Sequence, residues 1–199
     1  MLHDFGDDLH HLVDLELLPE EPVVVDAGAC IGDFAAAMLE LRPKAKIVCI
    51  EPSKRNRALL RNLLGRRVEI IPAALAAYAE VVDIHEPIGE GGRYYQWATI
   101  HPDLYSRANQ RPDLIEVDVY QVNCITIDFL LEHFGRIDYL KMDIEGSESA
   151  ILERGISPAM VRQVSIEMHL DYGLGKRLNE LGFEAIERRD SEIYARSPQ

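Results

Sequence analysis

The chain has 199 residues, of which 47% are hydrophobic and 28% are charged, a composition that suits one globular domain with a full core. Its formal net charge of −13 repels phosphate backbones, so nucleic acid is not an expected partner. The N-terminal residues are too polar for a signal peptide and no apolar run could span a bilayer, so we expect a cytoplasmic protein with no membrane partner.

The first third of the chain predicts alternating strands and helices. Residues 9–17 carry a partial helical stripe, which predicts a helical segment within residues 1–21. β-Branched runs then predict buried strands, separated by helices. The strands are expected at residues 22–26, 46–50 and 68–71, and the helices at residues 33–41 and between Ser53 and Gly65. Alternation with short connections predicts an α/β fold with a parallel sheet and right-handed crossovers.

The middle of the chain is less regular. Strands are expected at residues 81–84 and 115–122, on either side of an insertion at residues 89–109 that is rich in glycine and aromatic residues. Insertions of this length in a compact domain are usually functional, so we interpret residues 89–109 as a candidate substrate lid whose rings could stack on an acceptor. The alternative is a hydrophobic plug on the sheet edge. The rings concerned are those of Tyr94, Tyr95 and Trp97.

Regular elements return after the insertion. They are expected as a helix at 127–134, a strand at 137–142, a helix at 149–154, a strand at 161–168, a helix at 176–181 and an antiparallel hairpin of residues 183–187 and 193–196. The whole chain, residues 1–199, is therefore expected to form a single domain.

The turn after the first predicted strand has the features of a nucleoside-binding site. Asp26 ends that strand, and Gly28 and Gly32 permit a tight turn and close approach of a ligand. The second strand ends in Glu51, whose carboxylate could accept both hydrogen bonds of a ribose diol. Ligands of open α/β sheets bind at the carboxyl ends of the strands, so these residues predict an adenosine-type ligand.

The same turn disfavours a dinucleotide. A pyrophosphate is usually bound by a G-x-G-x-x-G turn, but here Cys30 replaces the middle glycine and Asp33 opens the helix. Carboxylates in this turn would repel a pyrophosphate but suit the cationic sulfonium and ammonium groups of S-adenosylmethionine. An NAD-type oxidoreductase is therefore the weaker alternative, and a non-catalytic nucleoside-binding module of the same fold is another.

A second group of polar residues follows the strand expected at 137–142. In the stretch LKMDIEGSE, residues 140–148, an apolar strand runs into a cluster of acids, and the next strand ends in an acid and a histidine. We expect both strand ends to lie beside the first turn. Clustered like charges are costly unless something compensates them, so they often mark sites. The residues that could converge are Lys141, Asp143, Glu145, Glu167 and His169.

Five segments, VVVDAGACIGDF, IVCIEPS, TIDFLL, LKMDIEGSES and VSIEMH, together resemble the FkbM family of S-adenosylmethionine-dependent methyltransferases. The K-x-D-x-E-G-x-E stretch is the most specific of them. The resemblance implies a class I (Rossmann-like) methyltransferase fold: a seven-stranded, mostly parallel sheet with an antiparallel C-terminal hairpin and helices on both faces. It also implies methylation of hydroxyl oxygens on sugars or other small molecules. Cys30 stands where many members have Asn, and residues 97–100 replace a Ser-rich stretch, so substrate identity does not carry over.

Roles in cofactor binding follow from this fold. We expect Asp26 and Gly28 to hold the amino-acid end of S-adenosylmethionine, with Gly32 shaping the turn and Glu51 binding the ribose. The cofactor's reactive end should lie near Asp143. Ala73 and Ala74, after the third strand, should border the adenine.

Roles in catalysis follow from the polar cluster. His169 is the first candidate for the base because its ordinary pKa is near neutrality, and Asp143 is the second. Glu145 and Glu167 are further catalytic candidates. For Lys141 we favour a structural ion pair. Glu148 is expected to favour the start of the next helix.

The sequence leaves three points open. Asp143, Glu167 and His169 could ligate a divalent metal, although we favour catalysis without a metal. The acidic residues could favour an amine acceptor over the expected small-molecule or glycan hydroxyl. The oligomeric state is not readable, and a homodimer is compatible with the sequence.

Overall fold

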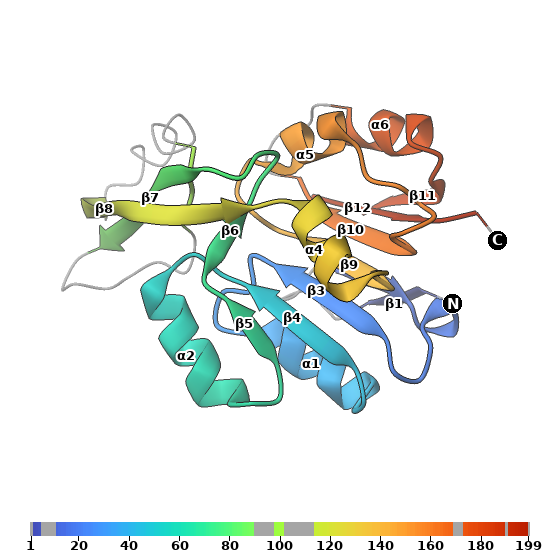
Figure 1. The fold of residues 1–199 in the computed structure, drawn as a ribbon, viewed down its shortest axis with the longest axis horizontal. Helices are drawn as coiled ribbons and strands as arrows, with labels where there is room; N and C mark the ends of the chain where they lie inside the picture. Colours follow the sequence, from blue (N-terminus) through green and yellow to red (C-terminus); the bar gives the residue numbers. More distant parts are fainter. Residues whose placement is uncertain are drawn as a thin grey trace.

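The computed structural model describes residues 2–4, 11–89, 98–101, 114–168, 173–189 and 191–198. Its main feature is a seven-stranded sheet in the order β11-β12-β10-β9-β3-β4-β5 (Figure 1). Across the sheet the strands are β11 (Glu184–Arg189), β12 (Glu192–Arg196), β10 (Gln163–Glu167), β9 (Tyr139–Met142), β3 (Val23–Ala27), β4 (Lys46–Ile50) and β5 (Glu69–Ile71). All neighbouring pairs from β10 to β5 are parallel, and β12 is antiparallel to both β10 and β11. The predicted class I sheet with its antiparallel hairpin is confirmed.

Helices cover both faces of this sheet (Figure 1). On one face, α1 (Asp33–Leu41) and α2 (Lys54–Leu64) pack against Val24 and alternate residues of the neighbouring strands. On the other face, α4 (Ile127–Phe134), α5 (Glu148–Arg154) and α6 (Leu174–Glu180) pack against Val25 and its counterparts. Successive residues of β3 therefore serve opposite cores, which explains why four of its five residues are apolar, Asp26 being the exception.

The second sheet lies beyond the β5 side of the first and has three strands (Figure 1). It consists of β6 (Ala73–Leu75), β8 (Leu114–Ile125) and β7 (Val81–Gly89). β6 is parallel to β8, whereas β7 and β8 form a long antiparallel pair. The sequence predicted strands within β7 and β8, but it did not predict that they leave the main sheet. The segment between them, which includes the candidate lid, is described only at residues 98–101.

The N-terminal part corrects one prediction. The structure has β1 (Leu2–Asp4) paired with β2 (Leu12–Asp14), followed by a single 3-10 turn, η1 (Leu15–Leu17), so the helical segment expected within residues 1–21 is wrong where the structure describes it. Distant side chains hold β2: the backbone N–H of Leu12 donates to Glu192, and that of Asp14 to Gln163 at 2.8 Å. These tertiary hydrogen bonds outweigh a weak local helical preference.

None of the helices in the described ranges is both long and apolar enough to cross a membrane.

Candidate functional site

A cavity of about 290 Å³ lies at the carboxyl ends of the parallel strands, near the lower limit of typical ligand pockets. It is lined by the turn after β3, the ends of β4 and β6, the loop after β9, and residues from the N-terminal segment and the central insertion. The lining residues are His11, Gly28, Ala29, Cys30, Asp33, Phe34, Ile50, Glu51, Pro52, Ala74, Leu75, Ala98, Ile100, Lys141, Asp143, Ile144, Glu145, Ser147 and Glu167.

The turn after β3 is pinned against its neighbours. The N–H groups of Gly28 and Ala29 both donate to the carbonyl of Ile50, at 3.0 and 3.2 Å. Gly28 has φ +74°, and a Cβ placed on it would lie only 1.7 Å from the carbonyl oxygen of Asp143. A glycine is therefore required here, both for the backbone conformation and for the close crossing of the β3 turn and the β9 loop.

Glu51 follows β4 and forms one wall of the cavity. Its two oxygens accept hydrogen bonds from the N–H groups of Cys30, at 2.8 Å, and Ser53, at 2.7 Å. Burial raises the pKa of Glu51 to about 7, although these N–H donors oppose the shift. The carboxylate is thus fixed in direction and poorly solvated, and it would gain from two further donors such as a ribose diol.

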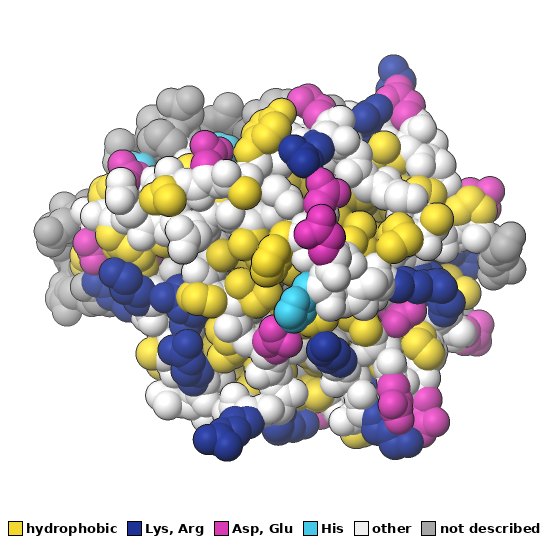
Figure 2. All heavy atoms as spheres, viewed as in Figure 1, with side chains coloured by type: hydrophobic (Ala, Val, Ile, Leu, Met, Phe, Trp, Pro, Cys, Tyr) yellow, Lys and Arg dark blue, Asp and Glu magenta, His cyan; other side chains and the backbone are white. Residues whose placement is uncertain are grey.

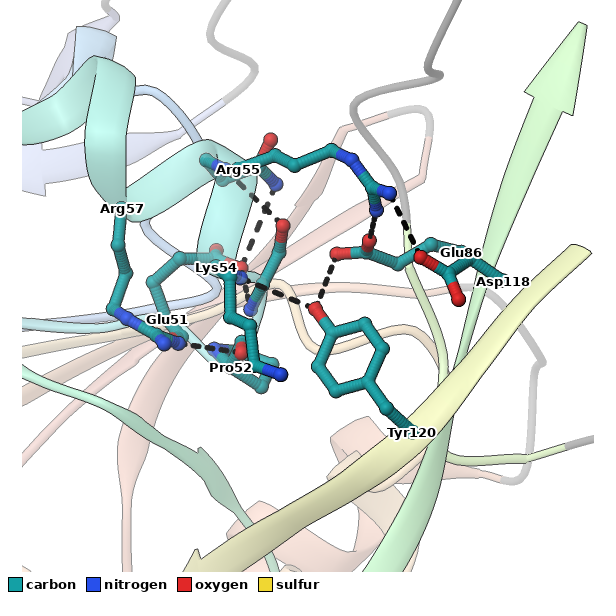
Figure 3. Close-up of polar contacts among 10 residues, drawn as sticks. Glu51, Pro52, Lys54, Arg55, Arg57, Glu86, Asp118 and Tyr120 are labelled. Atoms are coloured by element: carbon teal, nitrogen blue, oxygen red, sulfur yellow. Dashed lines mark hydrogen bonds and ion pairs between the residues drawn. The ribbon is translucent and has the colours of Figure 1, made fainter. Parts of the chain in front are cut away.

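Polar contacts of α2 surround Glu51 and connect this helix to the second sheet (Figure 3). The guanidinium of Arg57 donates to the carbonyls of Glu51 and Pro52. Arg55, two residues earlier on α2, pairs with Glu86 and Asp118 of β7 and β8. Basic side chains of α2 lie over that helix on the face shown in Figure 2. Arg55 and Arg57 are among the basic residues of α2, and both bind other parts of the protein.

Part of the cavity wall is apolar. Ala74 and Leu75 of β6 line it together with Ile50, whereas Ala73 is buried without lining it. Ala73 and Ala74 were both predicted to border an adenine, and of the two only Ala74 lines the cavity.

Lys141 is buried at the centre of the strand ends. Its ammonium lies 3.1 Å from Asp26 Oδ1 and 3.5 Å from Asp143 Oδ2, and it donates to the carbonyl of Gly28 at 3.0 Å. Burial alone would lower the pKa of Lys141, but the charges of Asp26 and Asp143 outweigh it and raise that pKa above its usual value. The predicted ion pair of Lys141 is confirmed.

Asp26 itself is fully buried and is absent from the lining of the cavity among the described residues. Asp26 pairs with Lys141, which itself lines the cavity, so the position of Asp26 does not support the direct cofactor contact expected from the sequence. Gly32 also lies off the cavity; its role is the one expected, since a Cβ there would press on Leu60 and Leu64 of α2 at 3.1–3.2 Å.

The contacts of the loop after β9 explain why several acidic residues follow this strand. Glu148 is almost fully buried at the first turn of α5, and its carboxylate accepts from the N–H groups of Ile144, at 3.2 Å, and Gly146, at 3.0 Å. Glu148 therefore holds the loop as well as starting the helix. Asp143 and Glu145 lie on the cavity side of this loop.

The central insertion contacts the same loop. Thr99 pairs with His85 of β7, and its hydroxyl donates to the carbonyl of Glu145 at 2.9 Å. The ring of His101 lies 2.8 Å from the hydroxyl of Ser147. Ala98 and Ile100 line the cavity between these anchors. The described part of the insertion is thus a wall of the cavity.

Comparison with known proteins decides the family. The sequence family described as "Methyltransferase FkbM domain" matches residues 26–187, most of the chain. The chain belongs to the FkbM methyltransferase family. The expected resemblance is confirmed, and membership identifies the chain as a methyltransferase rather than an oxidoreductase.

Three similar proteins show the extent of the match. Methyltransferase sdnD of Sordaria araneosa is 28% identical over 203 residues, covering 86% of this chain and 75% of that protein. The 2-O-methyltransferase NoeI of Sinorhizobium fredii (strain NBRC 101917 / NGR234) is 28% identical over 160 residues, covering 74% of this chain and 63% of that protein. The crystal structure of methyltransferase FkbM from Methylobacillus flagellatus KT superposes with a TM-score of 0.59 at 20% identity, covering 91% of this chain and 45% of that chain. The last similarity concerns the fold alone.

The cavity brings together most of the predicted site residues of this FkbM-family chain. The predicted residues that line it are Gly28, Glu51, Ala74, Asp143, Glu145 and Glu167. His169, the first candidate for the base, and the rings of Tyr94, Tyr95 and Trp97 lie outside the described residues.

Sequence reasoning missed His11. This residue precedes β2, is 2% exposed and lines the cavity opposite Asp143 and Glu167. Burial lowers the pKa of His11, against the opposing effect of a hydrogen bond with Glu192. The only local signal was a histidine pair at residues 10–11, and nothing in the sequence links that pair to a strand end more than 130 residues later.

Proposed function

We propose that this chain transfers the methyl group of S-adenosylmethionine to a hydroxyl oxygen on a small molecule or sugar. The observation that carries the proposal is the fixed, desolvated carboxylate of Glu51 on the wall of a cavity at the strand ends. Its two oxygens already accept from backbone donors and retain lone pairs for a diol. The FkbM family, and the name of NoeI as a 2-O-methyltransferase, support an oxygen acceptor.

The lining residues fit this cofactor. Glu51 would hold the ribose, and the apolar surface of Ile50, Ala74 and Leu75 would flank the adenine. Gly28 lines the cavity with its backbone, beside which the amino-acid end would lie. When bound, S-adenosylmethionine supplies a methyl group on a cationic sulfur, and the carboxylate of Asp143 at the same end of the cavity favours that charge.

The other end of the cavity is suited to an acceptor. A hydroxyl placed there must align with the methyl group and lose its proton as the new oxygen–carbon bond forms. Asp143, Glu145 and Glu167 all line the cavity; we place Asp143 where the cofactor and acceptor parts meet, and Glu145 and Glu167 on the acceptor part. The predicted base His169 follows Glu167 in the sequence by two residues. We assign proton removal and acceptor positioning to this group.

The central insertion supplies the acceptor-side wall. Ala98 and Ile100 in the cavity, together with the bonds of Thr99 and His101 to the β9 loop, support the lid interpretation over a plug remote from the site. The cytoplasmic setting and a homodimeric state remain predictions from the sequence.

A methyl-transfer assay tests the proposal. The protein is incubated with S-adenosylmethionine carrying a labelled methyl group and with matched panels of polyols, sugars, phenols and amines, and labelled product is detected by mass spectrometry. We expect turnover with hydroxylated acceptors and a loss of turnover in Glu51→Ala. Turnover confined to amines would overturn the oxygen assignment, and binding of S-adenosylhomocysteine without turnover on any panel would indicate a binding module.

A further inference from the structure

Three side chains from separate segments converge at the acceptor end of the cavity. His11 precedes β2, Asp143 follows β9, and Glu167 is the last residue of β10. One nitrogen or carboxylate oxygen from each lies within 4.8 Å of the other two. β9 and β10 are adjacent parallel strands, so their carboxyl ends bring the two acids to the same edge, and the N-terminal segment adds the histidine.

The ring of His11 is held in one orientation. Its Nδ1 lies 3.0 Å from the hydroxyl of Ser165, which in turn donates to the carboxylate of Glu192. Glu192 also accepts the backbone N–H of Leu12, so the same carboxylate positions the chain next to His11. The ring of Phe34 packs against His11 edge-on, with the centroids 5.6 Å apart.

This arrangement is one that metal-binding histidines use. With Nδ1 engaged by Ser165, Nε2 is the nitrogen left to act as a ligand, and a carboxylate behind the ring fixes its tautomer and direction. The fixed orientation of His11 does not depend on the two acids, and like them it points to a bound ligand. A mixed set of one imidazole and two carboxylates suits a divalent cation such as Mn²⁺ or Mg²⁺.

Lys141 is compatible with such an ion. Its ammonium is shared among Asp26, the carbonyl of Gly28 and one oxygen of Asp143. A carboxylate can contact an ammonium and a metal ion together, so this contact does not prevent Asp143 from acting as a ligand.

We propose that His11, Asp143 and Glu167 bind a divalent metal ion at the acceptor end of the cavity. The three protein ligands leave further coordination positions for water and acceptor oxygens, and this open site is what a catalytic metal requires. From the sequence we favoured catalysis without a metal and considered His169 as the histidine beside Asp143 and Glu167; the position of His11 reverses that preference.

The metal site also narrows the acceptor, provided that the proposed methyl transfer is correct. An acceptor with two adjacent oxygens, such as a vicinal diol, could chelate the ion and place one hydroxyl beside the methyl group. The ion would make that hydroxyl more acidic, and its proton would pass to Glu145, which lines the cavity but is not one of the three ligands. The new oxygen–carbon bond then forms as the carbon–sulfur bond breaks, and the sulfonium leaves as a neutral thioether.

Metal binding is tested without cofactor or acceptor, so that its failure is separate from failure of the proposed function. Mn²⁺ is titrated into the full chain, and free Mn²⁺ is followed by its electron paramagnetic resonance signal. We expect one bound Mn²⁺ per chain, with affinity reduced by roughly tenfold or more in Glu167→Gln and His11→Gln. Asp33→Asn is the matched control, because Asp33 lines the cavity outside the triad; its affinity should match that of the wild type.

A second variant tests the orientation of His11. Ser165→Ala removes the partner of Nδ1 but none of the ligands, and we expect about tenfold weaker Mn²⁺ binding. Thermal unfolding and S-adenosylhomocysteine binding are measured on every variant to show that it is folded. Wild-type protein that binds no Mn²⁺, or Glu167→Gln protein that binds it as tightly as the wild type, would overturn the metal site while leaving the methyltransferase proposal in place.

Discussion

Replacing Gly28 with alanine should destabilise the protein much more than the same change at an unobstructed glycine. The added Cβ would lie 1.7 Å from the carbonyl oxygen of Asp143, so the β3 turn and the β9 loop would have to separate by roughly 1 Å or more. The left-handed backbone, φ +74°, costs about 1 kcal/mol for alanine, and the displacement a further 1–3 kcal/mol or so. The total is about 2–4 kcal/mol.

Gly173 provides the matched control. It also has a left-handed backbone, with φ +72° and ψ +32°, but no heavy atom lies within 4 Å of a Cβ built there, so Gly173→Ala should cost only about 1 kcal/mol. Urea unfolding followed by circular dichroism measures both. Because Gly28→Ala displaces Asp143, it should also weaken S-adenosylhomocysteine binding, which Gly173→Ala should leave unchanged because Gly173 does not line the cavity. Equal destabilisation by the two changes would refute the close crossing.

Three further predictions concern the cavity wall. Burial raises the folded-state pKa of Glu51 from 4.5 to about 7. The stability that Glu51 contributes is therefore present below about pH 4.5 and is lost as the pH rises through 7. Relative to Glu51→Gln, the wild type should lose up to about 3 kcal/mol of unfolding free energy between pH 4.5 and 8, and parallel pH profiles of the two proteins would count against this. Cys30 has φ +50°, a left-handed backbone conformation that Asn adopts more readily than Cys. Cys30→Asn should therefore raise the free energy of unfolding by roughly 0.5–1 kcal/mol in urea titrations. A destabilised variant would show that packing of the thiol outweighs this backbone effect. Thr99→Val removes the hydrogen bond to Glu145, so acceptor KM should rise while S-adenosylhomocysteine affinity is unchanged; a change in affinity alone would contradict the role of the insertion as acceptor wall.

Much of the fold could be read from local patterns. The β-branched runs of β3 and β4, the Ser53 and Thr126 caps and the glycines that follow α2 and α4 gave elements close to those observed, because propensity, capping and burial agree there. The N-terminal segment failed because Leu12 and Asp14 are held by Glu192 and Gln163, which are distant in sequence. Local periodicity carries no information about such partners.

Some of the site residues could likewise be predicted from the sequence, and others could not. Gly28, Glu51 and Asp143 could be placed because strand ends of a parallel sheet share one edge. The burial of Asp26 beside Lys141 could not be predicted because the sequence does not show which of several acids pairs with a buried lysine. His11 could not be placed because its position depends on β2 packing beside β10, a contact between the two ends of the chain.

The central claim is that the carboxylate of Glu51 binds the ribose of S-adenosylmethionine in the cavity at the strand ends. Calorimetric titration of S-adenosylhomocysteine into the wild type, Glu51→Gln and the control Glu40→Gln tests it most directly, because Glu40 is an exposed residue of α1 that does not line the cavity. Hydrogen bonds to a charged acceptor contribute about 1.5–3 kcal/mol each, so we predict affinity lower by roughly tenfold to a hundredfold in Glu51→Gln and little change in Glu40→Gln. Equal affinity in the wild type and Glu51→Gln would contradict the claim.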